Sequence, residues 1–158
     1  MSLQKLVVPE DLSLHSDKLR ESGARIVFTN GVFDLLHPGH VLYLSAARDL
    51  GSHLIVAVNS DESAGRIKGE KRPLVPLAAR MEVLAALSSV NAVTFFEEDT
   101  PLKAIQAVRP DVLVKGGDWA PEKIVGREFV ESYGGKVVTI PFVSGYSTST
   151  LIDKIRKL

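Results

Sequence analysis

The sequence contains no cysteine among its 158 residues, which excludes disulfides, thiolate metal sites and a cysteine nucleophile. It also has no excess charge of either sign, because 19 Lys and Arg residues balance 19 Asp and Glu residues. Nucleic acid and anionic membrane surfaces are therefore not expected partners, and any bound anion has to be held by a local cluster. No stretch approaches the ~20 apolar residues that cross a bilayer, and residues 1–17 lack the apolar core of a signal peptide. These absences predict a cytoplasmic protein.

Two common nucleotide-binding motifs are missing as well. No Gly-x-Gly-x-x-Gly follows the first predicted strand, and no Gly-Lys-Ser/Thr of a P-loop occurs. A nicotinamide-dependent dehydrogenase and a P-loop kinase are therefore poorly supported.

The composition is that of a globular domain, with 45% hydrophobic and 24% charged residues. Strand and helix patterns alternate about five times with short connections, which predicts a parallel sheet with helices on both faces. Right-handed crossovers make this an α/β fold, a doubly wound Rossmann-like sheet in a single domain, 1–158. We expect a core at about 24–156 and an N-terminal extension at 1–23. Strands are predicted at 25–31, 53–60, 92–96, 111–114 and 136–140, helices at about 39–51, 77–87, 102–108, 126–133 and from 147, and a polar loop at 61–76.

Polar residues gather at the predicted carboxyl ends of the strands, where ligands bind in sheets of this type. The most informative are His37 and His40, which flank Pro-Gly at the entry to the first helix after a strand. Gly39 lets a ligand approach the backbone, and the free amides of a helix start favour an anion. Two imidazoles there can donate hydrogen bonds to phosphate oxygens. A lone histidine would more simply cap the helix, but a pair around Pro-Gly favours phosphate binding.

Residues 29–40 (TNGVFDLLHPGH) resemble the His-x-Gly-His signature of the cytidylyltransferase-like nucleotidyltransferase superfamily. Residues 145–150 (GYSTST) resemble its second signature, a Ser/Thr-rich start to the last helix. Further matches, including 68–73 (KGEKRP) and 110–118 (PDVLVKGGD), are most similar to the adenylyltransferase domain of the bifunctional ADP-heptose synthases. The resemblance covers about residues 24–156.

This resemblance implies transfer of AMP from ATP to D-glycero-β-D-manno-heptose 1-phosphate, giving ADP-heptose and pyrophosphate for lipopolysaccharide or another glycan. The alternative is a CTP-dependent cytidylyltransferase acting on glycerol 3-phosphate or a similar polyol phosphate, which is similar in size and motifs. A regulatory nucleotide-binding module without catalysis would not need both histidines, and a purely structural domain leaves the polar strand ends unexplained.

The resemblance also implies roles for individual residues. Catalysis falls to His37 and His40, with Lys68 closing over the phosphates. The same histidines are expected to bind the nucleotide together with Val32, Phe33, Lys115, Asp118, Tyr146, Ser147, Thr148 and Ser149. Asp34, Lys68, Arg72, Arg80 and Trp119 are expected at the acceptor substrate. Two of these have simpler readings, since Ser147 can merely cap the last helix and Arg80 can be an ion-pair partner.

The expected cofactor is Mg2+ carried with the nucleoside triphosphate, so we name no protein metal ligand. The partners are ATP or CTP and a phosphorylated sugar or polyol. A homodimer is typical of the family. In that family this domain is often fused behind a sugar kinase domain, and 158 residues hold one domain only. Either the sugar kinase of the same pathway is a separate protein, or this chain is a related transferase with another phosphorylated substrate.

Overall fold

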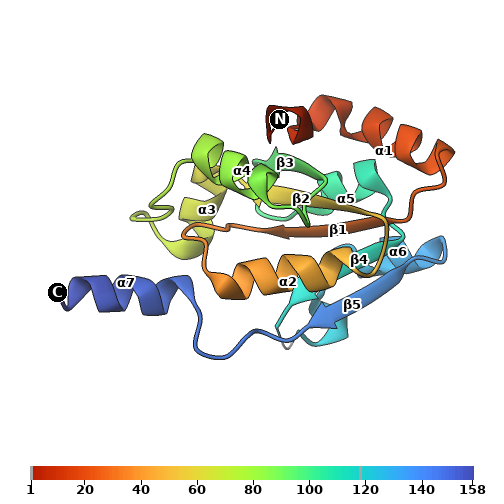
Figure 1. Ribbon diagram of the computed structural model, residues 1–158. Helices are drawn as coiled ribbons and strands as arrows, with labels where there is room; N and C mark the ends of the chain where they lie inside the picture. The colour runs from red at the N-terminus through yellow and green to blue at the C-terminus, as the bar shows by residue number, and fades with distance from the viewer. Residues whose placement is uncertain (1, 118) are drawn as a thin grey trace.

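The computed structural model describes residues 2–117 and 119–158, and its centre is a five-stranded sheet. The strands are β1 (Ile26–Gly31), β2 (His53–Asn59), β3 (Ala92–Phe96), β4 (Val112–Gly116) and β5 (Lys136–Ile140). Their order is β3-β2-β1-β4-β5, and each neighbouring pair is parallel (Figure 1). The predicted doubly wound parallel sheet is confirmed.

Helices cover both faces of the sheet. One face carries α2 (Pro38–Arg48) and α4 (Leu77–Ala86), and the other carries α1 (Leu12–Glu21), α5 (Leu102–Val108) and α6 (Arg127–Ser132). The short helix α3 (Asp61–Lys68) follows β2, and α7 (Thr148–Arg156) lies beyond the sheet, next to the start of α2 (Figure 1). Single 3-10 turns occur at Ser2–Lys5, Pro9–Asp11 and Pro121–Lys123. Among the described residues, no helix combines the length and apolar character that a membrane span requires.

The central strand β1 shows why the sheet is covered on both sides. Val27 packs into the cluster beneath α2 and α4, while its neighbours Ile26 and Phe28 pack into the cluster beneath α1 and α5. All three side chains are fully buried. Successive side chains of a strand point to opposite faces, so a continuous apolar run needs two cores.

One segment differs from the prediction. Residues 61–76 were expected as a loop, but 61–68 form α3, whose N-cap Ser60 accepts a hydrogen bond from the Ser63 amide (3.1 Å). Asp61 and Glu62 in the first turn complete a normal helix start, and the helix is simply too short to show apolar periodicity. Within the predicted N-terminal extension, 1–23, Leu12 is buried in the core cluster beneath α1 and α5.

The topology fixes where a ligand can bind. The chain leaves β1 towards β2 and β3, then crosses back to β4 and β5 on the other side of β1. The carboxyl ends of β1 and β4 therefore border the switch point, the usual crevice for ligands in open parallel sheets. The segment from Asn30 to α2 and the end of β4 at Gly116 both reach this crevice.

Candidate active site

A cleft of about 620 Å³ opens at the carboxyl edge of the sheet. It lies between the end of β1, the starts of α2 and α7, the end of α3 and the end of β4. Of the residues predicted for the site, Val32, Phe33, Asp34, His37, His40, Lys68, Arg72, Lys115, Trp119, Tyr146, Ser147, Thr148 and Ser149 line it. Asp118 lies outside the described residues, and Arg80 does not line the cleft.

The two histidines form a stacked pair at the start of α2. His37 is the N-cap in an extended conformation, Pro38 occupies the first turn, and the His40 amide donates to the His37 carbonyl (2.9 Å). The ring centroids of His37 and His40 lie 3.8 Å apart with an interplanar angle of 21°. Tyr146 stacks on the outer side of His37, and Phe33 meets the His40 ring edge-on. Both imidazoles are therefore held in place by rings from separate segments.

Burial determines the charge of this pair. It lowers the pKa of His40 to about 4, with the nearby His37 adding to the effect, and it also lowers the pKa of His37. Both rings are neutral at neutral pH, so each has one N–H to donate. Neither buried Nδ1 has a hydrogen-bond partner among the described residues. A polyanion bound in the cleft would raise both pKa values.

The close packing of His37 and Tyr146 around Gly39 leaves no room for a side chain at this position. A Cβ at Gly39 would lie 3.0 Å from Cε1 and Nδ1 of His37 and 3.2 Å from Cβ of Tyr146. The missing side chain therefore lets the His37 ring and the segment before α7 meet over the start of α2.

The start of α7 faces the same cleft. Ser147 caps this helix, and its Oγ accepts a hydrogen bond from the Thr150 amide (3.0 Å), as the simpler reading of this residue expected. Thr148 Oγ1 donates to the Leu35 carbonyl (3.3 Å), which joins α7 to the loop before α2. The first amides of a helix have no intrahelical acceptor, so those of Thr148 and Ser149 are available to an anion.

Asp34 has a role that differs from its predicted place at the acceptor. Its buried carboxylate accepts hydrogen bonds from the amides of Leu74 and Val75 (both 2.9 Å) and from Arg72 Nε (2.8 Å). Burial alone would raise the pKa of this carboxyl, but the backbone donors and Arg72 outweigh it and lower the pKa. Asp34 therefore anchors the segment after α3 as one wall of the cleft.

Arg80 is likewise used inside the fold, although it was expected at the acceptor. Its guanidinium is fully buried and donates to the carbonyls of Val75 (2.8 Å) and Val32 (2.6 Å) and to Asp61 Oδ1 (2.7 Å). The ion-pair reading of Arg80 is the one that the structure supports.

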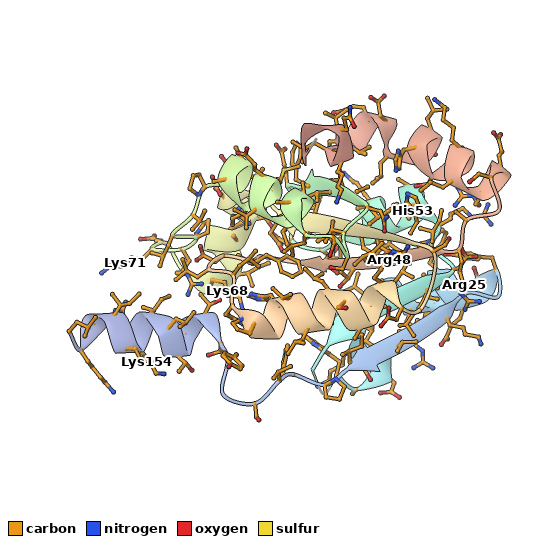
Figure 2. The ribbon with its side chains drawn as sticks, viewed as in Figure 1. Arg25, Arg48, His53, Lys68, Lys71 and Lys154 are labelled. Atoms are coloured by element: carbon orange, nitrogen blue, oxygen red, sulfur yellow. The ribbon has the colours of Figure 1, made fainter. Side chains whose placement is uncertain are left out.

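Basic side chains on the other walls face the opening. Lys68, at the end of α3, lies close to the starts of α2 and α7, whereas Lys71 points away from the molecule (Figure 2). Lys115 is the penultimate residue of β4, and its Nζ donates to Asn30 Oδ1 of β1 (2.8 Å). Burial lowers the pKa of Lys115 to about 8.

Asn30 and Phe142 are among the cleft residues that sequence reasoning missed. Asn30 was seen only as part of a polar strand end, and its pairing with Lys115 depends on a contact across 85 residues of sequence. Phe142 is 76% exposed, yet its ring packs on the end of β4, where a Cβ at Gly116 would lie 3.0 Å from Phe142 Cε1. An exposed aromatic in a polar loop offers no periodic signal, although two glycines opposite it could have suggested close packing.

The described part of the chain has no group of three His, Asp or Glu side chains arranged to hold a metal ion.

Comparisons with known proteins found a matching family, curated relatives and solved structures with the same fold. The cytidylyltransferase-like family matches residues 28–152. "Bifunctional protein HldE" of Hahella chejuensis is 51% identical over 148 residues, which is 94% of this chain and 31% of that protein. The protein of the same name from Geotalea uraniireducens is 57% identical over 134 residues, 85% of this chain and 27% of that protein. The chain thus spans under a third of the length of these curated relatives.

Two solved structures are similar as well. The lipopolysaccharide core biosynthesis protein of Thermoplasma volcanium is 30% identical, with a TM-score of 0.62, and the match covers 79% of this chain and 100% of that one. A pantoate-beta-alanine ligase from Francisella tularensis, solved with an ATP compound and beta-alanine, shares the fold at 14% identity. Its TM-score is also 0.62, over 97% of this chain and 78% of that one.

Proposed function

We propose a reaction for this chain from one premise: it belongs to the cytidylyltransferase-like family and is a nucleotidyltransferase. The reaction is transfer of AMP from ATP to D-glycero-β-D-manno-heptose 1-phosphate, which yields ADP-heptose and pyrophosphate. The observation that carries nucleotidyl transfer is the meeting of two helix starts, at His37–His40 and Ser147–Ser149, in one cleft. The names of the relatives, HldE and a lipopolysaccharide core biosynthesis protein, support the heptose acceptor.

The chemistry is a direct displacement at the α-phosphorus. An oxygen of the acceptor phosphate forms a bond to this phosphorus while the bond to the oxygen bridging to the β-phosphate breaks, and that electron pair leaves with pyrophosphate. The attacking phosphate is already an anion, so no general base is needed. Catalysis therefore consists of alignment and stabilisation of charge, which explains a site of imidazoles, cations and helix starts.

Each half of the site has a part in this reaction. His40 and His37 donate to the α-phosphate and to the bridging oxygen, where negative charge builds up in the transition state. The amides at the start of α7 and the hydroxyls of Thr148 and Ser149 hold the β- and γ-phosphates. Lys68 and Arg72 close over the phosphates from the wall after β2. Mg2+ arrives with ATP and neutralises part of the triphosphate charge.

Pyrophosphate release from a panel of nucleotides and phosphorylated acceptors tests the proposal. We expect turnover with MgATP and heptose 1-phosphate and little with CTP and glycerol 3-phosphate. Turnover only with the latter pair would refute the heptose assignment in favour of the alternative that the family name suggests.

Alanine variants of two histidines, one inside the site and one outside it, test the role assigned to His40. His40→Ala should lower kcat by about two or more powers of ten, as for loss of one preorganised donor. His53→Ala is the matched control, because His53 lies at the start of β2, at the opposite end of the sheet (Figure 2). Equal activity of the two folded variants would contradict the role given to His40.

A further inference from the structure

The two central strands separate before they reach the cleft. β1 stays paired with β2 up to its last residue, Gly31, and β4 stays paired with β5 up to Gly116. Between β1 and β4, in the described part of the chain, the paired positions end at Phe28 and Leu113. The carboxyl ends of the two strands that border the switch point are therefore connected by side chains rather than by a continuous backbone ladder.

A chain of hydroxyl groups spans this gap. Thr29 of β1 is fully buried, and its Oγ1 donates a hydrogen bond to the Val114 carbonyl of β4 (3.0 Å). The Oη of Tyr43, on α2, lies 2.6 Å from Thr29 Oγ1 and 3.5 Å from the Val114 carbonyl. A hydroxyl has a single proton to donate, and the shorter contact with Val114 uses that of Thr29. Tyr43 is therefore the donor to Thr29, which in turn donates to the Val114 carbonyl.

Packing holds Tyr43 in the same place. Its ring lies against the end of β4, because a Cβ at Gly116 would lie 3.3 Å from Tyr43 Cε2. Burial raises the pKa of Tyr43 to about 12, so the hydroxyl keeps the proton that it donates at neutral pH. The side chain thus joins α2 to β1 by a hydrogen bond and to β4 by a close contact.

His40 lies three residues before Tyr43 on α2, so the two side chains leave the helix on the same side, and both line the cleft. Among the described residues of α2, Tyr43 alone has a side chain that hydrogen-bonds to the sheet. The N-cap His37 makes no side-chain hydrogen bond to the helix. We infer that Tyr43 is a positioning residue, whose hydrogen bond to Thr29 fixes the start of α2 against the sheet and thereby sets the place of the His40 imidazole in the cleft.

The effect on rate rests on the proposed function, which gives His40 its role at the α-phosphate. Catalysis by alignment is sensitive to small displacements, and a misplacement of about 1 Å can cost about 100-fold in rate. Without the hydrogen bond to Thr29, a shift of a few tenths of an ångström at His40 should lower kcat by about tenfold. The Tyr43 hydroxyl is bonded to Thr29 inside the fold, so its loss removes no contact to either substrate.

The first test separates kcat from KM. Tyr43→Phe should lower kcat by about tenfold and change the KM of each substrate less than about threefold. Tyr133→Phe is the matched control, because Tyr133 Oη also donates to a carbonyl, that of Pro110 (2.8 Å), at the end of β4 away from the cleft. Both variants lose one hydrogen bond, so their melting temperatures should fall by similar small amounts. Equal kcat in the two folded variants, or a raised KM with unchanged kcat, would overturn the inference.

Variants of Thr29 test the other end of the same hydrogen bond. Thr29→Ser keeps the hydroxyl and should retain most of the wild-type kcat, whereas Thr29→Val removes it and should resemble Tyr43→Phe. Because both changes act through one bond, the double variant should lose no more kcat than the more impaired single variant. Losses that multiply in the double variant would show that Tyr43 acts independently of Thr29, against the inference.

The second test observes His40 without any turnover. The chain has four histidines, so their ring signals can be followed individually by NMR. Burial lowers the pKa of His40 to about 4, so in the wild type its signals should stay constant between about pH 7 and about pH 5. A loosened start of α2 in Tyr43→Phe admits water, so this pKa should rise towards 6.5 and the signals should move within that range. Constant His40 signals in Tyr43→Phe, as expected for Tyr133→Phe, would contradict the positioning role.

Failure of this inference and failure of the proposed function remain distinct. The kcat comparison is made with whichever phosphorylated acceptor the wild type uses, so turnover with glycerol 3-phosphate alone would refute the heptose assignment and leave the test of Tyr43 intact. Full activity of His40→Ala would refute the role proposed for His40, and the NMR comparison would still decide whether Tyr43 fixes the place of that ring.

Discussion

Gly39→Ala should separate the activity of this protein from its stability. Gly39 lies in the first turn of α2 and lines the cleft. The added methyl would lie 3.0 Å from Cε1 and Nδ1 of His37 and 3.2 Å from Cβ of Tyr146, so one or both must move by a few tenths of an ångström. The His37 ring is the easier to displace, because its Nδ1 has no hydrogen-bond partner among the described residues.

Stability and activity should respond differently to this change. Alanine is favoured over glycine in helices by up to about 1 kcal/mol, which offsets the cost of moving the ring, so the melting temperature should change little. A misplacement of about 1 Å can cost about 100-fold in rate, so a shift of a few tenths of an ångström at His37 should lower kcat/KM by about tenfold.

Thermal melts and pyrophosphate release on the same preparation provide the measurement. Ser45→Ala, at an exposed position of the same helix, serves as the control for helix propensity. Wild-type turnover in a folded Gly39→Ala protein would refute the argument that Gly39 is needed to place His37.

Three further predictions concern pH and stability. His40 has a pKa of about 4 in the folded protein against an ordinary 6.5, so the unfolded chain takes up this proton at higher pH, and the stability that neutral His40 contributes above pH 6.5 is lost as pH falls towards 4. His40→Asn should therefore shrink the difference in the free energy of urea unfolding between about pH 7 and about pH 5. A difference as large as that of the wild type would contradict the pKa shift. Arg80→Ala leaves the carbonyls of Val32 and Val75 without their buried donor and should lower the free energy of unfolding by roughly 3 kcal/mol or more. A loss under about 1 kcal/mol would show that water or a neighbouring group takes the place of the guanidinium as donor. Ser147→Ala removes the cap of α7, a helix that buries no residue, so the free energy of unfolding should change by less than about 1 kcal/mol while the KM of ATP rises. Unchanged ATP binding in calorimetry would exclude the start of α7 from the site.

The sequence predicted the sheet well because local patterns determine it. The apolar run within 53–60 is typical of a strand buried on both faces, and the alternation of strands with helices implies parallel order. The helix α3 was missed because eight residues are too few to show an apolar periodicity, although its cap was readable. β4 extends to Gly116, two residues beyond its predicted end, which places Lys115 inside a strand.

Site residues were predictable as a group and not as individual contacts. The two signatures identified His37, His40 and the segment from Ser147 to Ser149, and the structure brings them into one cleft. Residue type alone could not reveal that the carboxylate of Asp34 is already hydrogen-bonded to backbone amides, or that the guanidinium of Arg80 is buried inside the fold. Those outcomes depend on which chain segments meet in three dimensions, and no short motif contains that information.

The attachment of α7 has a consequence for how binding can be observed. The helix buries no residue, and Thr148 gives it a single side-chain hydrogen bond to the loop before α2. The β1 strand, by contrast, is paired on both sides and fully buried over its first four residues. Amide protons should therefore exchange with solvent quickly in α7 and slowly in β1, since local opening costs least where little is buried. Protection gained by α7 on addition of nucleotide would report occupancy of the cleft without any turnover.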